Sequence, residues 1–172
     1  MNLRLSNLFV LCAIVGLTAG CAGYHVGPVN GVVARQNSVE IVPFNNQTLQ
    51  PRLGDAVTQA LRERFQTDGT YRLATHNDGD LIVTGVLSLY KRQGLSYLSR
   101  DVATTENYRV ALTARVTVRE RSTNKLLLDK NVEGYTLVHV GLSLADAERQ
   151  AAPLLAQDLA RNITQLLTEG AW

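Results

Sequence analysis

The chain has 172 residues, with 17 lysines and arginines against 15 aspartates and glutamates, so its formal net charge is +2. That near balance argues against a nucleic-acid-binding protein, whose surface would be strongly basic. Hydrophobic residues make up 45% of the chain, which is enough to build one apolar core in a domain of ordinary size.

The first 20 residues have the three parts of a secretory signal peptide. Arg4 and the amino terminus supply positive charge, an apolar run from Leu8 to Leu17 follows, and small residues precede Cys21. This end resembles a bacterial lipoprotein signal, in which the cysteine becomes the first mature residue and carries acyl chains. It departs from that class at Thr18, where a leucine is usual. We expect residues 1–20 to be removed and Cys21 to be lipidated.

The apolar run is shorter than the roughly 20 residues that a membrane-spanning helix needs. The mature chain is therefore expected to be anchored to a membrane by lipid rather than to cross it. Several acyl chains would make that attachment stable, because one chain alone holds only marginally. Ala22 follows the cysteine, and its resemblance to outer-membrane lipoproteins implies the outer membrane, on the periplasmic side. Cys12 would leave with the signal, so no disulfide is expected.

Residues 21–36 are interpreted as a lipidated tether, because three glycines and Pro28 favour turns and extended chain. Residues 37–172 are interpreted as a single domain. Its first strand is predicted over residues 38–44, ending at Pro43 or lying at a sheet edge, since proline donates no ladder hydrogen bond. A turn is predicted from Asn45 to Thr48.

A helix is predicted from Pro51 to about Asp68. Its apolar residues recur every fourth position, at Leu53, Val57, Leu61 and Phe65. A short extended piece at 71–74 and a turn at 77–80 come next. A strand over 81–92 is then predicted, followed by a loop over 93–105. One face of this strand would carry Leu81, Val83, Leu87 and Leu89, and the other would carry Ile82, Val86 and Tyr90.

The clearest strand covers 108–119, where apolar residues alternate with arginine, alanine and threonine. A turn at 122–124 leads to a strand over 125–140, with an irregularity expected near 132–134. Ser143 should cap the last helix, whose apolar stripe includes Leu155, Leu159 and Ile163. Pro153 either kinks this helix or marks where its regular part begins.

This order of elements predicts an α+β fold. Two amphipathic helices should cover the dry face of a roughly four-stranded, largely antiparallel sheet, giving a two-layer sandwich. The other face of the sheet would stay available for binding.

Candidate catalytic and metal-binding patterns are missing from the sequence. The three histidines, His25, His76 and His139, have no metal-ligand spacing, and the residues around Ser143 do not form a nucleophile elbow. No glycine-rich phosphate loop is present. We therefore expect no catalytic residue, no metal and no cofactor, and a binding or assembly protein rather than a lipid-anchored enzyme.

Several segments taken together resemble one family. They are Cys-Ala-Gly-Tyr-His at 21–25, Val-Pro-Phe-Asn-Asn-Gln-Thr-Leu-Gln-Pro at 42–51, the helix to Phe65, and Gly-Asp-Leu-Ile-Val-Thr-Gly at 79–85. In their order and spacing they are similar to the lipopolysaccharide-assembly lipoproteins, LptE. The resemblance implies two helices over a four-stranded sheet. It also implies a plug inside the outer-membrane β-barrel subunit LptD, and binding of lipopolysaccharide.

The strand ending in Pro-Phe-Asn-Asn leaves an alternative open. A similar strand, followed by threonine and a helix, occurs in outer-membrane lipoproteins that activate peptidoglycan synthases or build curli-type secretion pores. Those folds alternate more helices with strands, and the long meander from 81 to 140 favours the lipopolysaccharide reading. No ligand-binding motif of the family can be matched here, so candidate ligand residues are chosen from charge. They are Lys91, Arg92, Arg109, Arg115 and Arg119, with Arg100 and Arg121 nearby.

Overall fold

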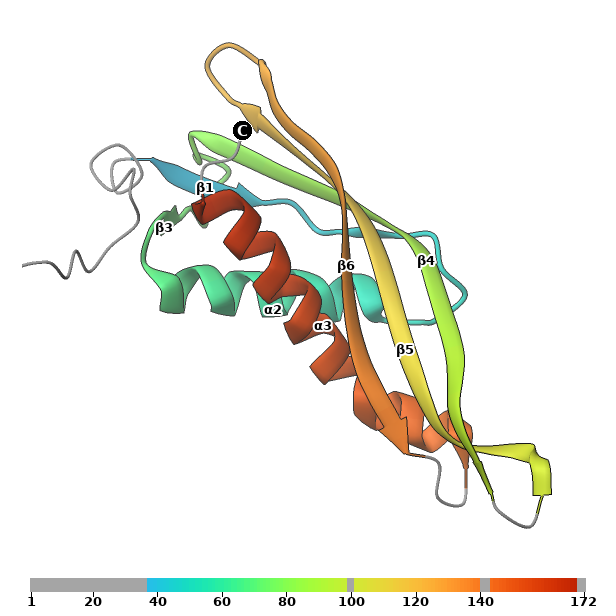
Figure 1. Cartoon of the computed structure of the whole chain (residues 1–172). Coiled ribbons are helices and arrows are strands. Elements are labelled where there is room, and N and C mark those ends of the chain that lie inside the picture. Colours follow the sequence, from blue (N-terminus) through green and yellow to red (C-terminus); the bar gives the residue numbers. More distant parts are fainter. Residues whose placement is uncertain (1–36, 99–100, 140–142, 170–172) are drawn as a thin grey trace, which may run out of the picture.

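The computed structural model describes residues 37–98, 101–139 and 143–169. Two helices cover one face of a long, twisted sheet (Figure 1). The elements in chain order are β1 (Ser38–Ile41), β2 (Asn45–Asn46), α2 (Leu53–Asp68), β3 (Arg72–Leu73), β4 (Leu81–Leu98), β5 (Asp101–Glu120), β6 (Leu126–His139) and α3 (Leu144–Thr168). The expected α+β architecture with two helices on the sheet is thus confirmed in its coarse form.

The sheet is larger and more mixed than the sequence predicted. Within the described residues it has six strands in the order β3-β1-β4-β5-β6, and β2 pairs with β4 further along the same side as β1. The β1, β2 and β3 pairings are parallel, whereas β4, β5 and β6 form an antiparallel meander. The prediction of about four largely antiparallel strands was therefore wrong. The two-residue strands β2 and β3 are too short to show a period.

The central hairpin is also longer than predicted. β4 runs to Leu98 and β5 begins at Asp101, so most of the loop expected over 93–105 is strand. Pairing extends from Leu81 opposite Glu120 to Leu98 opposite Asp101. Serine, glycine and charged residues interrupt the apolar residues of this segment, so the sequence shows no regular alternation there.

Both helices begin close to where the sequence placed them. Arg52, in the left-handed region at φ 62°, precedes α2, and Gly69 at φ 70° ends it. The Ser143 side chain accepts a hydrogen bond from the backbone N–H of Asp146, which confirms the expected cap of α3. Pro153 lies inside α3, and the helix is continuous through it from Leu144 to Thr168.

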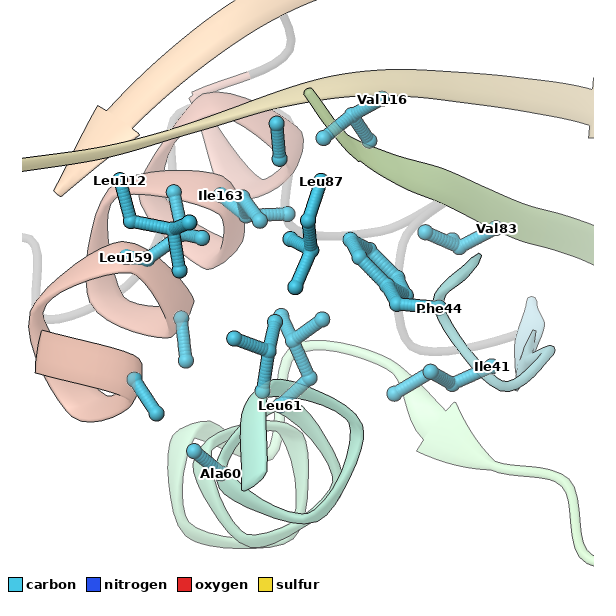
Figure 2. Packing of buried hydrophobic residues seen from close by; sticks show 14 of the residues in the cluster. Ile41, Phe44, Ala60, Leu61, Val83, Leu87, Leu112, Val116, Leu159 and Ile163 are labelled. Atoms are coloured by element: carbon cyan, nitrogen blue, oxygen red, sulfur yellow. The ribbon is translucent and has the colours of Figure 1, made fainter. Parts of the chain in front are cut away.

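The core lies between the helices and the covered face of the sheet. Leu61 of α2 and Leu159 of α3 are fully buried, as their helical stripes predicted. In Figure 2, Leu61, Leu87 and Phe44 point toward one another. Phe44 fits there because Gly85 has no side chain; a Cβ at Gly85 would lie 2.1 Å from the Phe44 ring.

Helix α3 crosses β6 at very close range. A Cβ at Gly134 would lie 2.5 Å from the backbone nitrogen of Leu159, so only glycine fits there. The Asp158 carboxylate accepts a hydrogen bond from the Tyr135 N–H at 2.9 Å, and the Asn162 amide donates to the Glu133 carbonyl at 2.8 Å. These contacts occupy backbone groups of an edge strand that would otherwise be open to strand pairing.

The irregularity expected near 132–134 in β6 is therefore not a break in pairing. The register against β5 is continuous there, and the shift lies instead where Val118 pairs with Leu128 and Arg119 pairs with Leu126. The alternation slips at Gly134 because α3, rather than a side chain, fills the space above it.

Candidate functional site

A β-bulge divides β4 into two parts with opposite side-chain directions. Leu87 pairs with Ala114 but Leu89 pairs with Thr113, so Ser88 is the extra residue. A one-residue shift of this kind moves every later side chain to the other face. Leu87 is fully buried, whereas Leu89 is 54% exposed on the open face. The predicted faces of Leu89 and Tyr90 were therefore wrong, since Tyr90 lies on the covered face.

The open face carries four of the five candidate cations. Arg109, Arg115 and Arg119 project from β5, opposite to the buried alternation of that strand, and Lys91 projects from β4 beyond the bulge. The structure therefore brings these four side chains together on one face of the sheet.

Two of these cations are held by neighbours. Arg115 donates from Nε and Nη2 to both oxygens of Asp129, at 2.8 and 2.7 Å. This contact raises the pKa of Arg115 and lowers the pKa of Asp129, through the side-chain hydrogen bonds first and the opposite charge as well. Arg119 donates from Nη1 to the Asn124 carbonyl at 3.1 Å. Both guanidinium groups therefore have protein acceptors before any ligand arrives.

Lys91 and Arg109 are placed differently. Lys91 of β4 pairs with Ala111 of β5, which pairs with Tyr135 of β6, so these three residues form one row across the sheet. Arg109 lies in the neighbouring row on the same face, where it pairs with Leu137 of β6. The Arg109 guanidinium carbon is 4.3 Å from the centre of the Tyr135 ring, a cation–π contact. Within the described residues neither cation has a carboxylate in ion-pair range.

Exposed apolar side chains surround these two cations. Tyr135 is 48% exposed and Leu137 is 63% exposed, and Leu89 lies one row away beside Thr113 and Glu133. We call the set Leu89, Lys91, Arg109, Tyr135 and Leu137 the open-face patch. It combines two cations with apolar surface on a rigid sheet, so it suits an amphiphile with anionic groups.

Arg92 lies on the covered face and makes a different kind of contact. Its guanidinium donates through Nε and Nη2 to the two carboxylate oxygens of Glu148 on α3. The Arg92 side chain is 45% exposed, but that of Glu148 is only 8% exposed. Tyr90 lies beside the pair, and burial first, then the Glu148 charge, raises the pKa of its phenol to about 12.

Two further candidates, Cys21 and Arg100, lie outside the described residues. Arg121, a third further candidate, pairs with Glu40 and donates to the Gly79 carbonyl, so it connects the end of β5 to β1. Across the described ranges no group of histidine, cysteine, aspartate and glutamate side chains is arranged to hold a metal ion. No helix in those ranges is long and apolar enough to span a membrane.

Sequence reasoning missed Glu148 and the aromatic and apolar part of the patch. Glu148 had a signal, because it lies seven residues before Leu155 and therefore on the apolar stripe of α3. A carboxylate on such a stripe indicates a buried partner. Tyr135 and Leu137 had none, since the face that they occupy depends on the register of β6 against β5.

The comparisons with known proteins define the class. The family model described as lipopolysaccharide-assembly, LptE, matches residues 36–167. The chain therefore belongs to the LptE family, and the resemblance inferred from its sequence is confirmed. No curated protein sequence is significantly similar to it.

Solved structures show the same fold at low sequence identity. A Xanthomonas campestris protein has a TM-score of 0.59 at 9% identity, covering 85% of this chain and 91% of its own. A hypothetical protein from Chlamydia trachomatis has a TM-score of 0.56 at 11% identity, and the match covers 77% of this chain and 95% of that protein. A minor lipoprotein from Acinetobacter baumannii has a TM-score of 0.55 at 16% identity, and the match covers 77% of this chain and 94% of that protein. These likenesses concern the fold alone.

Proposed function

We propose that this protein is an outer-membrane lipoprotein, anchored through Cys21 on the periplasmic side, that assists an LptD-type β-barrel in lipopolysaccharide assembly. The observation that carries the proposal is the family match over residues 36–167. The lipoprotein-type signal ending at Cys21 supports it independently, because it directs the chain to the membrane where that assembly takes place.

The barrel partnership follows from the family and is supported by the form of the sheet. β4, β5 and β6 present a long open face, and apolar Leu89, Tyr135 and Leu137 remain exposed on it. Exposed apolar residues that gather on one face mark a surface that contacts a partner or a lipid. We propose that the chain occupies the lumen of the barrel with this face near the passing ligand.

The open-face patch is the proposed lipopolysaccharide contact. Phosphate and carboxylate groups bind lysine and arginine through charge-assisted hydrogen bonds. Lys91 and Arg109 need give up no protein ion pair to make such bonds, whereas Arg115 must leave Asp129. We therefore rank Lys91 and Arg109 first among the cations selected from the sequence. Arg119 and Arg115 come after them, and Arg92 belongs to the other face.

Capture of the partner tests the assembly role. The full chain with an affinity tag, extracted from the outer membrane in mild detergent, should co-purify with a large β-barrel protein identified by mass spectrometry. Recovery of a peptidoglycan synthase instead would overturn the proposal in favour of the alternative lipoprotein class.

Lipid labelling tests the anchor. Cys21→Ser should abolish incorporation of labelled palmitate, because the acyl chains are attached through that residue. Equal labelling of the variant and the unaltered chain would contradict the proposed anchor.

A further inference from the structure

An apolar hollow lies on the covered face, at the end of the molecule where α2 begins and α3 starts. It has a volume of about 330 Å³ and is walled by Leu53 of α2, Val110 of β5, and Ala151, Ala152 and Leu155 of α3. Leu53, Val110 and Leu155 are almost completely buried and form its floor. The α3 residues that line it include Ala145, Ala151 and Ala152, whose small side chains leave space. Its size is at the lower end of the range of small-molecule sites.

On one side the hollow reaches Tyr90 and Arg92 of β4. A second hollow of about 400 Å³ lies between the 47–50 loop and β4, and both hollows share Gln50, Tyr90 and Arg92. The loop is held by its own side chains, with the Asn46 amide donating to the Gln50 carbonyl at 2.7 Å. β1 and β2 pair with β4 only as far as Leu87, so no strand among the described residues covers this edge beyond the bulge.

The chemistry of the walls selects an occupant. An inserted peptide would place backbone N–H and C=O groups against alanine, leucine and valine side chains, where their hydrogen bonds could not be replaced. A hydrocarbon chain has no such groups and gains free energy from each methylene removed from water. The hollow therefore fits one acyl chain better than a polypeptide.

The charges at the mouth select the headgroup. Arg92 and Arg149 are the cations among the residues that line the two hollows. Arg149 is paired with Asp146 on its own helix, and Arg92 is paired with Glu148. Glu148 is bound by the Nε and Nη2 edge of Arg92 and lies beneath it, so the opposite edge of the guanidinium points away from the carboxylate. That edge carries further N–H donors in a geometry that matches a phosphate or carboxylate.

We propose that this hollow binds a single acyl chain of an anionic amphiphile, with its headgroup at the outer edge of Arg92. The site goes beyond the proposed function because the hollow lies on the helix-covered face, on the opposite side of the sheet from Lys91 and Arg109. Free fatty acid, phospholipid and lipopolysaccharide share this chemistry, so the test must distinguish these sources.

The test uses the full chain in outer-membrane vesicles and a dodecanoic acid that carries a diazirine near its methyl end. After irradiation the protein is purified and the labelled residues are mapped by mass spectrometry. The label is expected on the peptides that contain Leu53, Val110 and Leu155. A label scattered over the surface would overturn the proposal.

Filling the hollow provides the matched comparison. Ala152→Phe occupies the space and should reduce labelling by about tenfold, the effect of a loss near 1.4 kcal/mol in binding. Leu154→Phe adds an aromatic ring on the exposed side of the same helix and should leave labelling unchanged. Ala145→Phe, at the exposed rim, repeats the test without any change to the core. Unchanged labelling in both Ala152→Phe and Ala145→Phe would contradict the site.

Competition identifies the source of the chain. Unlabelled dodecanoate, phosphatidylglycerol and lipopolysaccharide are added separately, and each that blocks the label at these residues is a ligand. If none of them competes, the proposal is wrong. Partner capture from the same vesicles tests the proposed assembly role independently. A negative labelling result therefore does not bear on the assembly role, and a negative capture result does not bear on the hollow.

Discussion

The two parts of β4 on either side of Ser88 differ in both surroundings and role. Before the bulge the strand lies between β1, β2 and β5, and its inward residues Leu81, Val83 and Leu87 join the core. After it the strand has β5 on one side only, within the described residues, and its inward residues are Tyr90 and Arg92. The first part stabilises the fold, and the second presents the cations and hollows that suit a ligand.

Leu87 and Leu89 give the largest expected contrast between these parts. Leu87→Ala should lower the free energy of unfolding by about 2–5 kcal/mol, because the fully buried side chain leaves a cavity. Leu89→Ala should change it by less than about 0.5 kcal/mol, as is usual for a surface position. Urea denaturation measures both. Similar losses at the two positions would mean that Leu89 is also buried, and would contradict the bulge.

Glu148 tests the polar part of the covered face. Glu148→Gln should destabilise the fold by about 1–2 kcal/mol, since Arg92 loses its charged partner while staying partly hydrated. Arg92→Met alone should cost a similar amount, and the double variant should cost less than the sum of the two. If the losses in free energy of unfolding of the two single variants simply add in the double variant, the two side chains do not interact.

A substitution at Thr164, in the core, should raise the stability of the fold by a smaller amount. Its hydroxyl is buried on α3 and has no hydrogen-bond partner among the described residues. Thr164→Val keeps the shape and removes the unsatisfied group, so it should raise the free energy of unfolding by about 1 kcal/mol. Thermal unfolding followed by circular dichroism measures the shift. A marked loss of stability would show that the hydroxyl has a partner.

The smallest effect concerns the paired end of β4 and depends on pH. Asp80 accepts hydrogen bonds from the backbone N–H and the hydroxyl of Ser38, and these lower the pKa of its carboxyl from the ordinary value. A lowered folded-state pKa gives stability that is present above the unfolded pKa and is lost as pH falls through the folded value. The loss in free energy of unfolding caused by Asp80→Asn should therefore be largest near neutral pH and should shrink in acid. A deficit independent of pH would exclude the charge as its cause.

How far the sequence predicted the structure depended on local pattern. β5 alternates over 108–119, and the stripes of α2 and α3 identified Leu61 and Leu159, so this part of β5, the two helices and the core face were predicted correctly. The bulge at Ser88 has no local signal, because either neighbouring leucine could face inward. It changed the side of the sheet on which Tyr90 and Arg92 lie, and with it the composition of the candidate site.

The candidate cations show the same limit. Residue type and alternation were enough to place Arg109, Arg115 and Arg119 on one face. They could not show that Asp129, a diagonal neighbour on β6, holds Arg115, or that Tyr135 lies beneath Arg109. Those contacts depend on the β5–β6 register, which is set by the whole hairpin rather than by any short segment.

Lipopolysaccharide binding to two charge-matched variants tests the central claim most directly. Lys91→Ala with Arg109→Ala, and Arg115→Ala with Arg119→Ala, each remove two positive charges from the same face of the full chain. Measured at low salt, the first pair should weaken binding by about tenfold or more, since each charge-assisted hydrogen bond contributes about 1.5–3 kcal/mol. The second pair should change it much less. Equal weakening by both pairs, or none by the first, would contradict the assignment of the ligand to the open-face patch.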